Sequence, residues 1–345
     1  MNTNEIRTGP GSGPGPGPGP GPGPGPGKLP PDVLTELLSL SGARRPDVLI
    51  GPRGGEDAAV IKRDDAPYLV AASDPIVGAS DGAGRLLVHV NANDVACKGG
   101  DPSWFVATLI VPVRDGVARV RALMEEIHEA CLEIGAAVVG GHTELTDRYD
   151  RAVISGTMLG PSRYDLRLEH IRAGDAIIAT KHVGLEGMSI IARDRPDLLS
   201  FLGPEAVDEA RSWRDGVSIL KEAQLMRSLA RYMHDPTEGG LAGGLLEMSL
   251  SGLTPVIEQE QIPLSPLTKR AAERLGFDPL HLISSGVLLA VVPPEAESEA
   301  MLRLSNNGVP SRVIGRFCEA KTADNTKGVP ILDAHEELWR VLEKT

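Results

Sequence analysis

Four segments in the first half of the 345-residue chain combine small residues with acidic side chains. They are GPRGGEDAAV at 51–60, ASDPIV at 72–77, NANDVACKGG at 91–100 and VVGGHTE at 138–144. Glycines let several backbone N–H groups approach one phosphate closely, and Mg²⁺ takes carboxylates together with phosphates and water. The four segments therefore predict a site for a nucleotide and Mg²⁺.

Three aspartates in these segments are the candidate Mg²⁺ ligands. Asp57 directly precedes an apolar strand start, and Asp74 follows a predicted strand. If the third segment is helical, Asp94 shares a face with Asn91, three residues earlier. A turn before a strand also explains GGED, and a helix N-cap also explains Asn-x-Asn-Asp, so these alternatives stay open. Each Mg²⁺ usually takes one or two carboxylates, so several aspartates suit more than one ion.

The fourth segment carries a histidine and a glutamate at the predicted carboxyl end of a buried strand, where α/β sites usually lie. His142 and Glu144 flank Thr143 there, directly after Gly140-Gly141. A neutral histidine can serve as a general base at pH 7. The alternative is a purely structural histidine.

A fifth segment, MHDPTEGGLAGG at 233–244, lies in the second half of the chain. Thr237, Glu238 and the glycines after them are predicted to open a helix, whose N-terminal N–H groups favour an anion. A well-capped helix start explains the Asp and Thr but not four glycines. The chain has neither the P-loop pattern GxxxxGK[S/T] nor the GxSxG nucleophile elbow.

Short strands and helices must position these segments. The predicted strands of the first half lie at 69–72, 104–113 and 153–159. Apolar residues spaced by three and four predict an amphipathic helix at 117–134. After a break at 160–172, strands are predicted at 176–180 and 286–292, and helices at 216–232, 240–251 and 295–305. The pattern indicates two α+β domains in series.

Changes in amino-acid composition and hydrophobic pattern divide the chain into four predicted parts. Residues 1–28, which contain a Gly-Pro tract at 9–27, are predicted to be a disordered tail. The first domain is expected at 29–162, beginning with a short helix at 33–40. The second domain is expected at 163–320, and a C-terminal extension at 321–345.

Composition excludes several classes of protein. With 35 Lys and Arg against 47 Asp and Glu, the net charge is −12, and only 3% of residues are aromatic, so a nucleic-acid partner is not expected. The three scattered cysteines argue against a disulfide scaffold or a structural zinc site and fit a reducing cytoplasm. No apolar run approaches the ~18 residues of a membrane span, and the N-terminus lacks a signal pattern. We therefore expect a cytoplasmic protein without a membrane partner.

In their order along the chain, these segments resemble the AIR synthase superfamily. It includes aminoimidazole ribonucleotide synthetase, thiamine-monophosphate kinase, selenophosphate synthetase and the hydrogenase maturation factor HypE. The family motifs Gly-Asp-Asp-Ala-Ala, Thr-Thr-Asp, Asn-Asp-(Val/Leu)-Ala and Gly-Gly-(Asp/Glu)-Thr are similar to GEDAA at 55–59, ASD at 72–74, NDVA at 93–96 and GGHT at 140–143. HDPTEGGLA at 234–242 resembles Arg-Asp-Pro-Thr-Arg-Gly-Gly-Leu-Ala of HypE. The resemblance covers about residues 30–318.

The resemblance implies a fold and a site. The fold is a homodimer in which the N-terminal sheets of two copies pair into a β-barrel, with a C-terminal α/β sandwich in each copy. ATP and Mg²⁺ are expected in the groove between subunits and domains. The implied metal ligands are Asp57, Asp74, Asp94 and Asp235. The implied ATP-binding residues are Gly54, Gly55, Asn93, Gly140, Gly141, Thr143, Thr237, Gly239 and Gly240, and the candidate catalytic residues are His142, Glu144 and His234.

Two departures from the family pattern bear on the reaction. HypE acts on a thiocarbamate carried by its own C-terminal cysteine, whereas the last cysteine here is Cys318 and the chain ends in VLEKT. His142 stands where kinases of the family have Asp, and Glu144 could substitute for it as a metal ligand.

These features predict an ATP- and Mg²⁺-dependent, HypE-like enzyme that phosphorylates an amide or carbonyl oxygen. The expected acceptor is a small molecule or a protein-borne group, and a maturation protein is an expected partner. The alternatives are a small-molecule kinase like thiamine-monophosphate kinase and a non-catalytic ATP-binding maturation partner.

Overall fold

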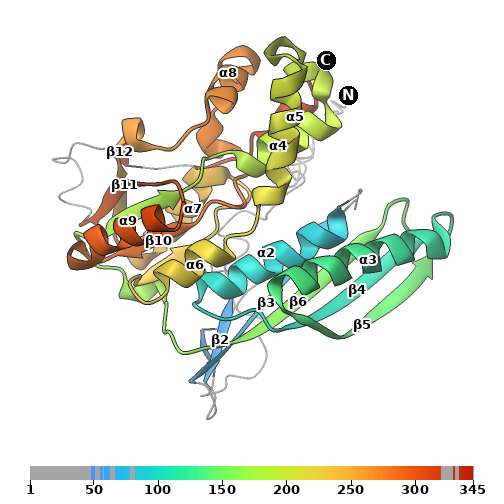
Figure 1. The fold of residues 1–345 in the computed structure, drawn as a ribbon, viewed down its shortest axis with the longest axis horizontal. Helices are drawn as coiled ribbons and strands as arrows, with labels where there is room; N and C mark the ends of the chain where they lie inside the picture. The colour runs from blue at the N-terminus through green and yellow to red at the C-terminus, as the bar shows by residue number, and fades with distance from the viewer. Residues whose placement is uncertain are drawn as a thin grey trace, which may run out of the picture.

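The structure is a computed structural model that describes residues 48–50, 55–56, 58–62, 67–77, 82–319, 329–330 and 334–344. The predicted Gly-Pro tail and the predicted helix at 33–40 lie outside the described residues. So do Gly54 and Asp57. Two six-stranded sheets, one after the other along the chain, organise the rest (Figure 1).

The first sheet has the strand order β1-β2-β3-β6-β4-β5. Its strands are β1 (Val48–Ile50), β2 (Ala59–Lys62), β3 (Tyr68–Val77), β4 (Trp104–Pro112), β5 (Ala137–Thr146) and β6 (Val153–Ser162). Neighbouring strands are antiparallel except β4 and β5, which are parallel because helix α3 connects them.

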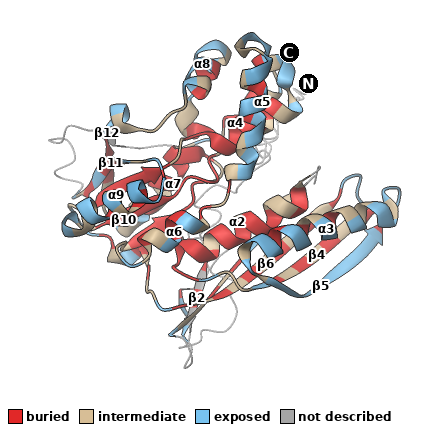
Figure 2. Ribbon diagram, viewed as in Figure 1, coloured by how far each residue is buried: buried red, intermediate tan, exposed pale blue. Residues whose placement is uncertain are grey.

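Two helices, α2 (Ala83–Cys97) and α3 (Gly116–Ile134), pack on one face of this sheet (Figure 1). Alternate residues of β4, such as Phe105 and Leu109, are buried against them, as period-two alternation requires. On the opposite face, Thr108 and Ile110 are only half-buried. We call this second side of the first sheet the open face. Figure 2 shows α2 almost entirely buried and edge strand β5 almost entirely exposed.

The second sheet has the order β12-β9-β11-β7-β10-β8, and all its pairs are antiparallel. Its strands are β7 (Ala176–Thr180), β8 (Tyr232–His234), β9 (Thr254–Ile257), β10 (Leu289–Val292), β11 (Ser311–Cys318) and β12 (Val329–Pro330). The helices around it are α4 (Leu185–Asp194), α5 (Pro204–Ser212), α6 (Leu220–Met226), α7 (Gly240–Met248), α8 (Pro266–Leu275), α9 (Glu297–Asn306) and α10 (Leu338–Leu342). Short 3₁₀ helices lie at Leu168–His170, Pro196–Leu202, Trp213–Gly216, Ser249–Ser251, Gln259–Gln261, Pro279–His281 and Pro294–Ala296.

Both faces of the second sheet are covered. Ile178 of β7 packs in one apolar core with residues of α6 and α9, whereas its neighbour Ile177 packs in another with residues of α7. A third core joins α4, α5, α8 and α10. Neither sheet closes into a barrel within the described part of the chain. Among the described helices, none has the length and apolar character needed to span a bilayer.

Three sequence predictions about element bounds were wrong. The helix expected at 216–232 is the shorter α6, and Tyr232 begins strand β8 instead, because β10 supplies its backbone partners through Val291 and Leu289. Asp74 does not follow a strand but lies inside β3, which continues to Val77 because β6 pairs with all ten of its residues.

The third error concerns the glycine pair before His142. We predicted a strand end there, but β5 runs on to Thr146 because it pairs with β4 as far as Pro112. Gly140 through Glu144 therefore form the middle of an edge strand.

Candidate functional site

Helix α2 joins the two domains through a buried polar contact. It packs on β3 and β6 of the first sheet and also contacts α6 and β8 of the second domain. The Asn93 Nδ2 donates to Asp235 Oδ2 at 2.6 Å and to the Val217 carbonyl at 2.8 Å. Asn93 Oδ1 accepts from the backbone N–H of Ile219 at 3.0 Å. Because Asn93 is fully buried, these bonds meet its hydrogen-bonding needs without water.

Asp235 is held as tightly as its partner. Its second oxygen, Oδ1, accepts from the backbone N–H of Gly286 at 3.1 Å, and the residue is 2% exposed. Both carboxylate oxygens therefore bind groups of the protein. This arrangement connects α2, β8 and the segment before β10.

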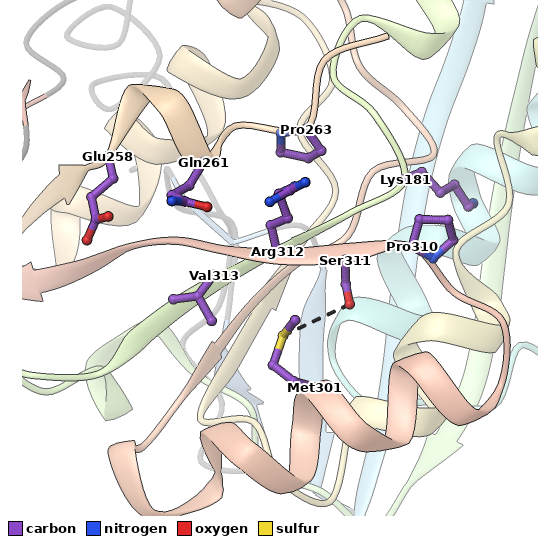
Figure 3. Close-up of a pocket in the computed structure, with 9 residues that line it drawn as sticks. All are labelled: Lys181, Glu258, Gln261, Pro263, Met301, Pro310, Ser311, Arg312 and Val313. Atoms are coloured by element: carbon purple, nitrogen blue, oxygen red, sulfur yellow. Dashed lines mark hydrogen bonds between the residues drawn. The ribbon is translucent and has the colours of Figure 1, made fainter.

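The loop that Asn93 contacts is itself anchored by Lys181. Its Nζ donates to the carbonyl oxygens of Gly216 at 2.9 Å and Ser218 at 2.6 Å, and lies 3.1 Å from Glu222 Oε1. The same lysine borders a cavity of about 580 Å³ along β11, which Met301 of α9 and the segment from Glu258 to Pro263 also line (Figure 3). None of the predicted site residues that the structure describes lines that cavity.

Two of the predicted metal ligands lie beside the same face of α2. The Asp74 N–H donates to Asn91 Oδ1 at 2.9 Å, and the Asn91 Nδ2 donates to the Leu87 carbonyl at 2.8 Å. Asp94 follows Asn91 by three residues, so both project from one side of the helix. Both aspartates are partly exposed. This confirms the predicted shared face of Asn91 and Asp94.

The predicted anion-binding turn begins helix α7. Gly239 and Gly240 have φ values of 80° and 61°, which side chains rarely tolerate, and the helix starts at Gly240. The Gly239 N–H donates to Glu336 Oε2 at 2.7 Å, so a carboxylate from the C-terminal segment already contacts this turn. Burial raises the pKa of Glu336, while the N–H of Gly239 and other backbone donors favour its charged form.

His234 is buried within the second domain. It is 2% exposed, and its Nε2 lies 3.1 Å from Glu247 Oε2 of α7. A Cβ on Gly244 would come within 2.9 Å of the imidazole, so the helix backbone packs directly on the ring. His234 thus packs between β8 and α7, and its predicted catalytic role stays a prediction.

His142 and Glu144 lie apart from the aspartates. Across the first sheet, Asp74, Gly156, Ala107 and Gly141 are successive register partners, so β5 is three strand spacings, about 14 Å, from β3. His142 pairs with Thr108 and Glu144 with Ile110, which places both on the open face. Their side chains are 66% and 57% exposed, and His142 Nε2 lies 3.6 Å from Glu144 Oε2.

The other predicted residues of β5 share this location. Gly140, Gly141 and Thr143 are exposed in the same strand. Within one copy of the chain, Asn93 and Asp94 belong to α2, Asp74 contacts this helix through Asn91, Asp235 contacts it through Asn93, and the β5 residues lie apart.

The carboxylates around α2 can supply only part of the coordination shell of Mg²⁺. Among the described residues, no three His, Cys, Asp or Glu side chains converge closely enough to hold a metal ion by themselves. Asp74 and Asp94 nevertheless offer hard oxygen ligands of the kind that Mg²⁺ combines with phosphate oxygens and water. The fit is therefore to a metal–nucleotide complex and not to an isolated cation.

Sequence reasoning missed a second buried cluster between the domains. Lys98 forms an ion pair with Glu56, and the Tyr232 hydroxyl donates to the Gly55 carbonyl oxygen. The signal for it was a charged lysine directly after the small, apolar residues VAC at 95–97. A charge that ends such a helix is usually exposed, so the burial of Lys98 became apparent only in the structure.

Comparison with known proteins adds the family. The AIR synthase related protein N-terminal domain matches residues 55–161, and the corresponding C-terminal domain matches residues 172–324. Carbamoyl dehydratase HypE of Azotobacter vinelandii is 30% identical over 67% of this chain and 68% of its own length. The chain belongs to the AIR synthase superfamily. Its fold is accordingly the two-domain AIR synthase fold, as the sequence motifs predicted.

Other relatives of this AIR synthase-related chain are also HypE proteins. Carbamoyl dehydratase HypE of Bradyrhizobium diazoefficiens is 34% identical, and the match spans 62% of each chain. The chain thus matches less than two thirds of that relative's length. Among solved structures, a HypE–HypF complex has a TM-score of 0.68 at 21% identity, covering 88% of this chain and 99% of that one. A HypE structure in complex with ATP has a TM-score of 0.64 at 20% identity, covering 89% and 91%.

Proposed function

We propose that this chain is an ATP- and Mg²⁺-dependent, HypE-like enzyme that phosphorylates an amide or carbonyl oxygen of its acceptor. The observation that carries the proposal is the arrangement around α2. There the N–H of Asp74 in β3 donates to Asn91, which projects from the same side of α2 as Asp94, while Asn93 is bonded to Asp235 of the second domain. The Asn93–Asp235 contact between the domains, with Asp94 next to Asn93, supports a metal–nucleotide site between them.

The acids and the glycines have separate roles in this proposal. Asp57, Asp74 and Asp94 hold Mg²⁺, which when bound neutralises charge on the phosphates. Asp235 keeps Asn93 and the second domain in register with α2. Thr237, Gly239 and Gly240, with Gly54 and Gly55 in the first domain, bind phosphate oxygens, mainly through backbone N–H groups. Glu336 must leave the Gly239 N–H for a phosphate to bind there.

A homodimer would supply the residues of β5. In the proposed dimer, the open faces of two copies pair into a β-barrel, and His142, Glu144, Gly140, Gly141 and Thr143 of one copy approach the nucleotide of the other. The exposure of β5 on both faces supports this proposal, because a long bare edge strand is a liability unless a partner covers it. In that setting His142 or Glu144 is within reach of an acceptor or a metal ion, which neither is within one copy.

The biological role proposed here is hydrogenase maturation in the cytoplasm, with a maturation protein as partner. The support is that two relatives of 30% identity or more are carbamoyl dehydratase HypE proteins and that one similar solved structure is a HypE–HypF complex. The acceptor is a small molecule or a group carried on a protein. Cys318, the last cysteine, ends strand β11 and is partly buried, so it is poorly suited to carry the acceptor.

The test is nucleotide binding by isothermal titration calorimetry with and without Mg²⁺. The wild-type protein is expected to bind ATP only with Mg²⁺, and Asp94→Asn is expected to abolish that binding because a metal ligand loses its charge. Asp208→Asn, an exposed aspartate on α5, is the matched control and should bind as the wild type does. Unchanged affinity in Asp94→Asn would refute the assignment. Release of ADP and inorganic phosphate, with no stable phosphorylated product, would then separate this reaction from that of a kinase.

A further inference from the structure

One carboxylate of the C-terminal segment occupies the turn that begins α7. Glu336 Oε2 accepts from the backbone N–H of Gly239 at 2.7 Å. Its Oε1 accepts from the N–H of Ile283 at 3.3 Å and from the N–H of Leu338, the first residue of α10, at 2.7 Å. Gly239 precedes α7, and Ile283 lies in the segment before β10. Two segments distant in the sequence thus direct N–H groups at one carboxylate, and we call the N–H groups of Gly239 and Ile283 the anion nest.

The segment that carries Glu336 is held beside the anion nest. A Cβ on Gly239 would lie 3.8 Å from the Cβ of Ala334, so the segment packs on the turn before α7. Leu338 and Val341 anchor α10 in the apolar core that it shares with α4, α5 and α8. Glu336 itself is only partly buried. Its side chain can therefore turn toward solvent while α10 stays in place.

A second carboxyl group beside Glu336 has an oxygen without a partner. Glu186 of α4 is 5% exposed, and its Oε2 has no hydrogen-bond partner within the part of the chain that the structure describes. Burial raises the pKa of Glu186, and the charge of Glu336 raises it further, although hydrogen bonds from Ser285 oppose the shift. A neutral Glu186 carries an O–H donor, and buried donors normally have an acceptor. An oxygen of a bound ligand would satisfy this donor.

The charges around the anion nest favour a phosphate that brings a cation with it. Burial raises the pKa of Glu336, and the charge of Glu238 adds to the shift, although the backbone N–H donors oppose it. A bare anion at this place meets the same opposition. A phosphate of Mg²⁺-bound ATP carries its own counter-ion and has more oxygens than a carboxylate. It can accept from both N–H groups and from Glu186 together.

We propose that Glu336 is an intramolecular competitor, which occupies the anion nest until a phosphate of the Mg²⁺–nucleotide complex displaces it and accepts from Gly239, Ile283 and the carboxyl group of Glu186. The proposal rests on the proposed function and adds the regulation of that site. The fraction of protein that has Glu336 in the nest cannot bind the phosphate there, so the C-terminal segment lowers the apparent affinity. Hydrogen bonds to a charged group typically favour the bound form by about 10- to 100-fold.

The first measurement is the affinity for a non-hydrolysable ATP analogue with Mg²⁺, by isothermal titration calorimetry. Glu336→Ala is expected to bind about 10-fold more tightly than the wild type, because no carboxylate competes for the nest. Glu336→Gln is neutral but keeps one acceptor oxygen, so its affinity is expected to lie between the two. Glu343→Ala, at an exposed position directly after α10, is the matched control and should have wild-type affinity.

The second measurement uses the wild-type chain and keeps the test decisive if a Glu336 variant fails to fold. Amide hydrogen exchange is followed by nuclear magnetic resonance with and without the Mg²⁺–analogue complex. The Leu338 N–H is expected to exchange faster when the complex binds, because Glu336 leaves it, whereas the Gly239 N–H stays protected by the phosphate. The Val341 N–H, which donates to the Glu337 carbonyl oxygen at 3.0 Å, is the control and should not change.

The outcomes separate the two proposals. A folded Glu336→Ala protein that binds no more tightly than Glu343→Ala would overturn the competition. A Leu338 N–H that keeps its protection when the complex binds would overturn it too. Both results leave the proposed function intact, because they require that the wild-type protein binds the analogue with Mg²⁺. A wild-type protein that does not bind this complex would overturn both proposals.

Discussion

The two sheets of this protein have six strands each but differ in how many of their faces are buried. In the second sheet, adjacent residues such as Ile177 and Ile178 both lie in apolar cores, because helices pack on either side. In the first sheet only one side is packed by α2 and α3, and the open face carries half-buried residues such as Ile110. A sheet that is buried on both sides is complete within one chain. The first sheet, with its bare β5 edge, is the part that gains from a second copy.

The candidate site residues also divide between buried and exposed parts of the molecule. The buried polar residues that join the domains cluster on α2, the helix layer between the two sheets. The exposed polar residues His142 and Glu144 lie on the open face, outside that layer. If the first domain dimerises through the open face, the two groups belong to one site built by two chains. If it does not, they belong to different surfaces.

The largest effect is expected from a charge placed on the open face. Ile110→Glu puts a carboxylate beside Glu144, its register partner, and should convert a dimer into a 36.4-kDa monomer, because burying an unpaired charge opposes association. Sedimentation velocity would measure the mass. Leu132→Glu, 65% exposed on α3, is the control and should remain a dimer. A dimeric Ile110→Glu protein would show that the copies do not meet through this face.

The next largest effect is a loss of stability when a buried side chain of the second sheet is shortened. Ile178→Ala should lower the free energy of unfolding by about 2–5 kcal/mol, because the fully buried side chain leaves a cavity between β7 and the helices α6 and α9. Urea unfolding followed by circular dichroism would measure it. Leu302→Ala, 60% exposed on α9, should change the value by about 0.5 kcal/mol or less. Equal losses in both variants would contradict the description of the two cores.

The smallest expected effect is a loss of folding stability at low pH, caused by a buried histidine of α2 in the first domain. Burial, with a smaller contribution from Arg85, lowers the pKa of His89 to about 4, although Glu133 opposes the shift. The folded pKa is below the unfolded value of about 6.5, so the unfolded chain binds more protons between these limits. The stability that neutral His89 contributes is therefore fully present above pH 6.5 and is lost as the pH falls toward 4, by up to about 3 kcal/mol.

Unfolding experiments at pH 7 and pH 4.5 would measure this loss. His89→Leu should show a weaker decrease in stability over that range than the wild-type protein. His128→Leu, at an exposed position on α3, should retain the wild-type pH dependence. Identical pH dependence in His89→Leu and the wild type would show that His89 is not the group responsible.

Much of the fold could be predicted because local patterns match the final elements. The strands at 176–180 and 104–113 and the helix at 117–134 were placed within a residue or so, since alternation and three-to-four spacing are set by burial on one or both sides. Strand ends were predicted less well. β3 and β5 continue past Asp74 and His142 because neighbouring strands offer hydrogen bonds there, and no local signal reports a neighbour.

The same distinction applies to the candidate site. The glycines before α7 and the shared face of Asn91 and Asp94 could be predicted, because backbone conformation and helical periodicity are local. The Lys98–Glu56 pair could not, because its members are 42 residues apart and their burial depends on the second domain packing over them.

The sequence by itself determined the family, the order of the two domains and the acidic, glycine-rich segments available for a metal–nucleotide site. These follow from residue identities and short spacings. The tertiary structure alone decided which acids share a side of α2, which histidine is buried and which is exposed, and which lysine lies between the domains. Such facts arise when segments distant in sequence exclude water from one another, and that exclusion is a property of the packed chain.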